Sequence, residues 1–258
     1  MGTYVDIDGH ATWVEEQGSG EETVLLLHGG LSDSSLLLDS MGDALAASRR
    51  VVAFDRRGHG RTADTADPFH YDDMATETIG VLETVVGGPA HLVGWSDGGI
   101  VALLVALQRP DLVGKLVPIG ANFHYDGLAP ISLDPDSPVA AMIAQAYGER
   151  SPDGLDHFPV VLGKAMTMFA SEPTLTTDDL EGITAPTLVL SGDDDGVRLD
   201  HTCAMFLALP AGQLAVVPGS SHAVPIEKPA DVARLVVDFL SSGPPETFMP
   251  ILRAASTS

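Results

Sequence analysis

Gly94-Trp95-Ser96-Asp97-Gly98-Gly99 is the stretch that decides the fold of this chain. It lies between two apolar runs, 90–93 and 100–107, which predict a strand that turns sharply into a helix with Ser96 at the turn. The glycines at 94 and 98 give the pattern G-x-S-x-G, in which only small neighbours let strand and helix pass so closely. The pattern also occurs in ordinary Gly-rich turns, but the flanking strand and helix favour the strained turn. Its serine hydroxyl lies where unpaired backbone N–H groups favour negative charge.

The composition describes a strongly acidic chain that is large enough for a sizeable core. Its 258 residues are 45% hydrophobic, which suits one large domain or one domain with an insertion. With 36 acidic and 13 basic residues, the formal net charge is −23. Such a surface repels phosphate backbones and anionic lipids, so partners among nucleic acids and membranes are disfavoured. The charge otherwise serves solubility or attracts cationic substrates.

Cysteine usage and the N-terminus predict a cytoplasmic protein. Cys203 is the only cysteine in the sequence, which excludes an intrachain disulfide and a cysteine-type zinc site. Residues 1–6 lack the charged and apolar regions of a signal peptide, and no apolar run is long enough to span a bilayer. We expect a cytoplasmic chain, with a monomer and a homodimer both open.

Strands and helices alternate along most of the chain. A hairpin is predicted over 3–16 around Asp8-Gly9. The predicted strands that follow are 23–27, 50–54, 90–93, 115–119, 186–190 and 213–217, and the helices are 36–47, 71–86, one from 97, 199–208 and 229–240. This alternation indicates parallel βαβ units. It breaks over 121–182, where only weak helical stretches at 139–147 and 158–169 are predicted, so this segment is interpreted as an insertion over one end of the sheet.

A serine needs a base within hydrogen-bonding distance to act as a nucleophile, and the base needs an acid to fix its tautomer. In a doubly wound sheet, ligands gather at the C-terminal ends of the strands. Four histidines fall at that end: His28, His59, His124 and His222. His222 is the favoured base because the turn residues 218–221 and Pro225 hold its loop. The acid is expected among Asp193, Asp194 and Asp195, which follow the strand 186–190.

These motifs, in this order, resemble those of α/β-hydrolase fold enzymes. The resemblance covers nearly the whole chain apart from the insertion, and it is carried by His28-Gly29-Gly30, the loop 55–60, the turn 94–98, the run 192–195 and Gly219-Ser220-Ser221-His222. It implies an α/β fold with a mostly parallel doubly wound sheet and an N-terminal antiparallel hairpin. It also implies a single domain, 1–258, with a small, mainly helical cap at 121–182. The serine–acid–histidine order is that of the family, and family spacing selects Asp195 as the acid.

The same resemblance implies an oxyanion hole made of two backbone N–H groups. One belongs to Asp97, and the other to Gly30, with Leu31 as the alternative donor. The resemblance also implies that His28 and His59 shape the loops around the site. Arg56 and Arg57 are expected to pair with nearby carboxylates, with a solvated role as the alternative for one of them. No metal and no cofactor is required.

Asp97 is the unusual residue of the turn, because many relatives carry an apolar or amide residue there. The hexapeptide 94–99 is similar to that of valacyclovir hydrolase-like enzymes, in which this aspartate pairs with the ammonium group of an amino-acid ester. Otherwise Asp97 caps the helix. The further candidates for contact with the substrate are Leu31, His124, Tyr147 and Met166.

The resemblance implies a serine hydrolase that cleaves a small carboxylic ester or a related acyl compound (EC 3.1.1). In this interpretation Ser96 attacks the carbonyl, His222 takes the proton and Asp195 orients His222. The alternatives are carbon–carbon bond hydrolysis, lactone hydrolysis and perhydrolysis by the same triad, or ligand binding without catalysis. The expected partner is a small-molecule acyl substrate.

Overall fold

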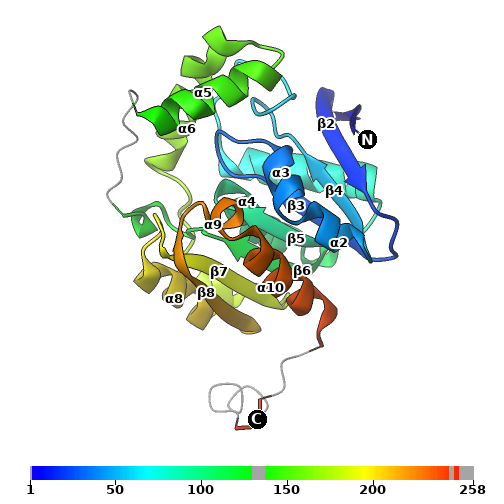
Figure 1. The fold of residues 1–258 in the computed structure, drawn as a ribbon, viewed down its shortest axis with the longest axis vertical. Coiled ribbons are helices and arrows are strands. Elements are labelled where there is room, and N and C mark those ends of the chain that lie inside the picture. The colour runs from blue at the N-terminus through cyan, green and yellow to red at the C-terminus, as the bar shows by residue number, and fades with distance from the viewer. Residues whose placement is uncertain (1, 130–136, 244–246, 250–258) are drawn as a thin grey trace.

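Eight strands form one sheet in the described part of the chain, which in this computed structural model comprises residues 2–129, 137–243 and 247–249. Their bounds are Gly2–Ile7 (β1), His10–Gln17 (β2), Thr23–Leu27 (β3), Arg50–Phe54 (β4), Ala90–Trp95 (β5), Val113–Ile119 (β6), Thr187–Asp194 (β7) and Gly212–Ser221 (β8). The order across the sheet is β1-β2-β4-β3-β5-β6-β7-β8 (Figure 1).

The sheet is antiparallel at one end and parallel elsewhere. β1 pairs with β2, and β2 with β4, in antiparallel register, whereas every pair from β4 to β8 is parallel. The hairpin turns at Asp8 and Gly9, whose φ angles of 52° and 85° are those that an Asp-Gly turn supplies. The predicted mostly parallel sheet with an N-terminal hairpin is therefore confirmed.

Helices cover both faces of the sheet (Figure 1). Their bounds are Ser34–Leu37 (α1), Asp43–Ala46 (α2), Tyr71–Val81 (α3), Asp97–Gln108 (α4), Pro138–Arg150 (α5), Phe158–Phe169 (α6), Thr177–Glu181 (α7), Leu199–Ala208 (α8), Val224–Glu227 (α9) and Pro229–Ser241 (α10). One π-helical turn joins α1 to α2 and another extends α3, so the predicted helices at 36–47 and 71–86 are each continuous. Among the described residues, no helix is long and apolar enough to cross a membrane.

The core consists of two apolar layers, one on each face of the sheet. Successive residues of β3 alternate between them: Leu25 and Leu27 join the layer under α3 and α4, while Val24 and Leu26 join the layer under α1, α2 and α10. All four are at most 1% exposed. A strand that is buried on both faces needs apolar side chains at successive positions. This explains why polar and apolar residues do not alternate along residues 23–27.

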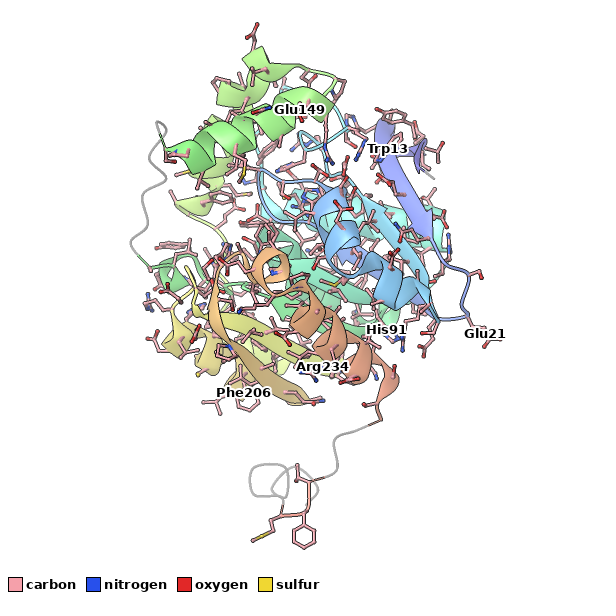
Figure 2. The ribbon with its side chains drawn as sticks, viewed as in Figure 1. Trp13, Glu21, His91, Glu149, Phe206 and Arg234 are labelled. Carbon is pink, nitrogen blue, oxygen red and sulfur yellow. The ribbon has the colours of Figure 1, made fainter. Side chains whose placement is uncertain are left out.

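The segment between β6 and β7 contains α5, α6 and α7. Figure 1 shows α5 and α6 beyond one end of the sheet, and Figure 2 places Glu149 on α5 at the opposite end of the molecule from Phe206 on α8. Tyr147 of α5 packs on Phe158 of α6 with ring centroids 5.4 Å apart. Residues 130–136 of the predicted 121–182 insertion lie outside the described residues.

The parallel strands all end at one edge of the sheet, and each is followed by a residue that matters below. These residues are His28 after β3, Asp55 after β4, Ser96 after β5, Gly120 after β6, Asp195 after β7 and His222 after β8. Because the carboxyl ends of parallel strands meet at the same edge, the fold gathers residues that are far apart in sequence.

Candidate active site

Ser96 occupies a strained turn between β5 and α4. Its φ and ψ angles are 54° and −120°, in a region that residues with a side chain rarely adopt. A Cβ on Gly94 would lie 2.1 Å from the carbonyl oxygen of Gly98, and a Cβ on Gly98 would lie 2.0 Å from that of Leu27. The backbone N–H of Ser96 donates to Ile119 O at 2.8 Å, which ties the turn to β6. The glycine spacing therefore has the steric cause that the sequence predicts.

Three predicted residues meet at this edge in one chain of hydrogen bonds. Nε2 of His222 lies 2.9 Å from Oγ of Ser96, and Nδ1 of His222 lies 2.7 Å from Oδ1 of Asp195. The side chain of Asp195 is 1% exposed and that of His222 is 37% exposed. Asp193 instead accepts from the backbone N–H of Ser220, and Asp194 is exposed. Of the three aspartates considered, Asp195 is the one that contacts His222.

The carboxylate of Asp195 is held in its ionised form. Burial favours its neutral form, but hydrogen bonds from His222, Val197 N–H and the Ser191 hydroxyl outweigh burial and lower its pKa. A carboxylate that remains ionised at neutral pH accepts the Nδ1 proton of His222, which leaves Nε2 free to accept from Ser96. The carboxylate thus sets the tautomer of the base.

Gly120 leaves room for this contact, and no motif in the sequence indicates this role. Its φ is 56°, and a Cβ there would lie 3.0 Å from Oδ2 of Asp195 and 3.2 Å from Nδ1 of His222. Trp95 was also missed as a support, although it lies inside the G-x-S-x-G motif. Its Nε1 donates to the carbonyl oxygen of His222 at 2.8 Å, with the two ring centroids 5.8 Å apart. These contacts between strand ends fix the position of the imidazole.

Gly30 lies beside the start of α4. A Cβ on Gly30 would lie 2.4 Å from Oδ2 of Asp97 and 2.8 Å from Cζ of Phe169 in α6. The loop after β3 is therefore packed between the turn at Ser96 and the last residue of α6. Leu31 follows with a φ of 55° and is half-buried. The two predicted donor residues, Gly30 and Asp97, are neighbours in space, as an anion-binding pair of N–H groups requires.

The Asp97 side chain is buried beside the start of α4. Ser96 occupies the N-cap position, and Oδ1 of Asp97 accepts from the Tyr71 hydroxyl at 2.9 Å. Asp97 is 4% exposed, and its Oδ2 is buried with no hydrogen-bond partner within the described residues. Burial raises the pKa of Asp97, whereas Arg56 and the Tyr71 hydroxyl act in the opposite direction. Tyr71 opens α3, twenty-six residues upstream, and nothing in the sequence marks its role.

The loops behind the site are held by the expected histidines. Nε2 of His28 accepts from the backbone N–H of Arg56 at 3.1 Å, and Nδ1 of His59 lies 3.0 Å from Arg57 O. Burial lowers the pKa of both histidines, that of His59 to about 3, so both stay neutral. Arg57 pairs with Asp67 at 3.6 Å, whereas Arg56 bonds to Gly29 O.

The remaining candidates for substrate contact come from the segment between β6 and β7. Nδ1 of His124 lies 2.7 Å from Oδ1 of Asp126, and Tyr147 is buried against Phe158. Met166, in α6, is 45% exposed. In the described residues, no hydrogen bond joins His124 or Tyr147 to Ser96 or His222, so their contact with a substrate stays a prediction.

This arrangement can move a proton from the Ser96 hydroxyl to His222 while Asp195 stabilises the resulting imidazolium. Among the described residues, no group of three or more His, Cys, Asp or Glu side chains is placed to hold a metal ion.

Comparisons with known proteins show the family and the fold of this chain. Residues 24–235 match the model of the Alpha/beta hydrolase family. The chain is 32% identical to the putative carbamate hydrolase RutD of Variovorax paradoxus, over 88% of this chain and 95% of that protein. It is 27% identical to the sn-1-specific diacylglycerol lipase ABHD11 of Mus musculus, over 93% and 85% of the two chains. A solved serine hydrolase involved in carbazole degradation (CarC enzyme) superposes with a TM-score of 0.77 at 24% identity, over 93% of this chain and 98% of that one. The chain therefore belongs to the alpha/beta hydrolase family and is a hydrolase of the α/β fold.

Proposed function

We propose that this protein is a serine hydrolase that cleaves small carboxylic esters or related acyl substrates through an acyl-enzyme. The observation that carries the proposal is the hydrogen-bond chain from Ser96 through His222 to Asp195, formed at a strained turn between a strand and a helix. A serine is activated when a base accepts its proton and a third group orients that base, and the three residues meet both conditions.

In the first half of the reaction, Oγ of Ser96 attacks the substrate carbonyl carbon while Nε2 of His222 takes its proton. The carbonyl oxygen becomes negatively charged and accepts from the N–H groups of Gly30 and Asp97. His222 then gives its proton to the leaving alcohol, and the acyl group remains on Ser96. Asp195 stays ionised throughout, because its pKa is lowered by the hydrogen bonds that it accepts.

In the second half, a water molecule replaces the alcohol. His222 takes a proton from this water, and the hydroxide attacks the acyl-enzyme carbonyl. The tetrahedral intermediate collapses, Ser96 regains its proton from His222 and the carboxylic acid leaves. The two halves use the same groups in the same positions, so no residue beyond this set has to enter or leave the site.

The names of the relatives support an acyl substrate and leave its identity open. A carbamate and a diacylglycerol each contain a carbonyl carbon bound to a heteroatom, which is the bond type that this mechanism cleaves. Lactone and carbon–carbon bond hydrolysis by the same three residues remain the alternatives. An activity screen with p-nitrophenyl esters of different acyl length, lactones and carbamates would identify the bond.

We also propose that α5 and α6 form a cap that selects the substrate. The observation that supports this role is the position of Phe169 at the end of α6, against Gly30 in the loop after β3. An apolar ring over a donor of the oxyanion hole restricts the acyl group that fits there. Met166 lies three residues earlier on the same helix and, like Tyr147 of α5, is a cap candidate for substrate contact.

A second candidate function is the hydrolysis of substrates that carry an amino group. Oδ2 of Asp97 is a buried carboxylate oxygen without a described partner, next to Gly30, and it would accept a hydrogen bond from an amino group of the substrate. An aminoacyl ester would then be preferred over its des-amino analogue. A turnover ratio near one for the wild-type protein would remove this candidate.

The experiment that tests the main proposal is hydrolysis of p-nitrophenyl acetate by the wild type and by Ser96→Ala. We expect the substitution to lower kcat by at least about 10⁴-fold, because it removes the nucleophile. Ser34→Ala is a matched control that removes a buried serine hydroxyl outside the hydrogen-bond chain of Ser96, His222 and Asp195, and we expect it to keep most of the activity. Hydrolysis that survives Ser96→Ala unchanged would exclude the mechanism.

A further inference from the structure

Arg56 is a buried cation that the mechanism above does not use. It has the largest side chain among the fully buried residues, with 0% exposure. A guanidinium buried in protein costs free energy unless charges or hydrogen bonds compensate it. In the described residues, Arg56 forms no ion pair with a carboxylate, and its Nε and Nη1 have no hydrogen-bond partner. The remaining contacts of Arg56 indicate what this buried cation does at its position.

Those contacts converge on the carbonyl oxygen of Gly29. Nε2 of His28 accepts from the backbone N–H of Arg56, so the single proton of this neutral ring is on Nδ1. That proton is donated to Gly29 O at 2.7 Å. Nη2 of Arg56 donates to the same oxygen at 3.2 Å and also lies 3.2 Å from Nδ1 of His28. Two buried donors, Nδ1 of His28 and Nη2 of Arg56, therefore hold Gly29 O in place.

The direction of the Gly30 N–H follows from this contact. Gly29 C=O and Gly30 N–H belong to one peptide unit, which is planar, and in its trans form the two bonds point in opposite directions. Gly29 and Gly30 are consecutive glycines, so their own conformational preferences restrict this unit little. Because the two donors fix the direction of the Gly29 C=O bond, they also fix the Gly30 N–H bond, which points the opposite way.

The charge of Arg56 also acts on the same place. The carboxylate of Asp97 lies beside Gly30, where a negative charge opposes the formation of an oxyanion. Burial raises the pKa of Asp97, and the charge of Arg56 is the strongest of the effects that lower it. In turn, Asp97 is the charge that most favours the protonated form of Arg56. Each of the two buried side chains thus favours the charged form of the other without touching it, while burial remains the larger effect and leaves the pKa of Asp97 raised and that of Arg56 lowered.

We propose that Arg56 is a positioning residue of the oxyanion hole: it orients the Gly30 N–H through Gly29 O, and its charge offsets that of Asp97. Arg56 acts through these two residues and does not touch the substrate. The inference rests on the proposed serine mechanism. It predicts that Arg56 contributes to the stabilisation of the tetrahedral intermediate and little to the binding of the ester itself.

The test compares Arg56→Met with Arg57→Met, using p-nitrophenyl acetate and a trifluoromethyl ketone, which forms an anionic tetrahedral adduct. We expect Arg56→Met to lower kcat by about 10²-fold, as the loss of one oxyanion donor does, with KM within about threefold of the wild type. The affinity for the ketone should fall by the same factor as kcat/KM. Arg57, whose guanidinium bonds to Thr65 and Pro68 O, is the matched control and should leave all three values near those of the wild type.

Two further variants separate positioning from a general loss of structure. Arg56→Lys keeps the charge but shortens the reach to Gly29 O, and we expect an intermediate loss of about tenfold in kcat. Asp97→Asn removes the opposing charge, so Arg56→Met/Asp97→Asn should be about tenfold more active than Arg56→Met. If Arg56→Met does not fold, the kcat and ketone affinity of Arg56→Lys decide the question.

Wild-type kcat and ketone affinity in folded Arg56→Met or Arg56→Lys would overturn the inference. A double variant that is no more active than Arg56→Met would do the same. Both results, obtained with an inactive Ser96→Ala protein, would leave the proposed function standing, whereas an active Ser96→Ala protein would overturn that function first.

Discussion

The strand ends and the α5–α6 helices are held in place by different means. At the strand ends, buried side chains form hydrogen bonds with backbone groups. Asp55 is 0% exposed, and its carboxylate accepts from the backbone N–H groups of Ser34 and Arg61, each at 2.8 Å. The helices instead are joined to the core partly by ion pairs. Lys164 of α6 pairs with Asp64 at 2.7 Å, and Glu172, just after α6, pairs with the half-exposed His70 at 2.6 Å.

This difference separates two tasks. Transition-state stabilisation requires reacting groups held within fractions of an ångström, which buried hydrogen bonds between strand ends provide. Substrate selection, the role proposed above for α5 and α6, requires a surface that can be opened and exchanged, and helices held by side-chain contacts suit that role. We therefore expect changes at the strand ends to alter kcat, and changes at the junction of the helices with the core to alter KM. The predictions below run from the largest expected effect to the smallest.

His222→Ala should have the largest effect of these four. We expect kcat to fall by about 10⁴-fold or more, because Ser96 loses its base, while the melting temperature changes little since the ring is partly exposed. Steady-state kinetics and thermal melts measure both. His91→Asn is the matched control, since His91 (labelled in Figure 2) is the second residue of β5, whereas Ser96 follows the last residue of that strand. Comparable losses in the two variants would mean that His222 has no special role.

Asp195→Asn should come next, with a loss of about 10³- to 10⁴-fold in kcat, because an amide in that place favours the wrong tautomer of His222. Asp194→Asn tests the neighbouring carboxylate, which is exposed and should tolerate the change. The kinetics of both variants, measured between pH 6 and pH 9, would show which carboxylate acts. A loss that is confined to Asp194→Asn would contradict the assignment.

Asp64→Asn should mainly affect substrate binding. Its carboxylate accepts from Lys164 and lies 2.9 Å from Nε2 of His157, and both partners belong to the segment between β6 and β7. We expect KM to rise about threefold to tenfold and kcat to stay within about twofold, since only the junction of α6 with the core is weakened. Asp67→Asn, in the same loop but exposed, is the control. A fall in kcat at constant KM would contradict the claim that changes at this junction alter KM and changes at the strand ends alter kcat.

The pair of His70 and Glu172 should give the smallest effect, and one that depends on pH. The hydrogen bond with Glu172 raises the pKa of His70. A raised pKa means that the stabilisation is complete below the unfolded value of about 6.5 and disappears as pH rises through the folded value. The melting temperature of the wild type should therefore exceed that of His70→Gln at pH 5.5 by more than at pH 8.5. An equal difference at both values would show that the pair contributes no charge-dependent stability.

Sequence reasoning could predict those parts of the candidate site that are encoded locally. The turn at Ser96 is specified by its own glycines, and the order of strand and helix around it is visible in the apolar runs. The choice of Asp195 among three adjacent aspartates required the family's spacing, because all three follow the predicted strand 186–190. In the structure β7 extends to Asp194, so only Asp195 follows it. The structure then placed Asp195, and neither of the other two, within 2.7 Å of His222.

The parts that sequence reasoning missed depend on contacts between distant segments. Tyr71 reaches Asp97 across twenty-six residues, and Phe169 reaches Gly30 from another layer of the fold. Gly120 is required only because Asp195 and His222 pass close to it. Nor did the sequence indicate that Arg56 bonds to Gly29 while Arg57 pairs with Asp67. Such contacts follow from the packing of the sheet edge, which no single stretch of the chain specifies.

The most direct test of the central claim is covalent labelling of the folded protein with a fluorophosphonate, followed by intact mass and peptide mapping. The account predicts one adduct per chain, on Ser96, with none in Ser96→Ala and labelling slowed at least about 10³-fold in His222→Ala, because the unassisted hydroxyl is a weak nucleophile. Folded wild-type protein that takes up no label, or that carries the label on another residue, would contradict it.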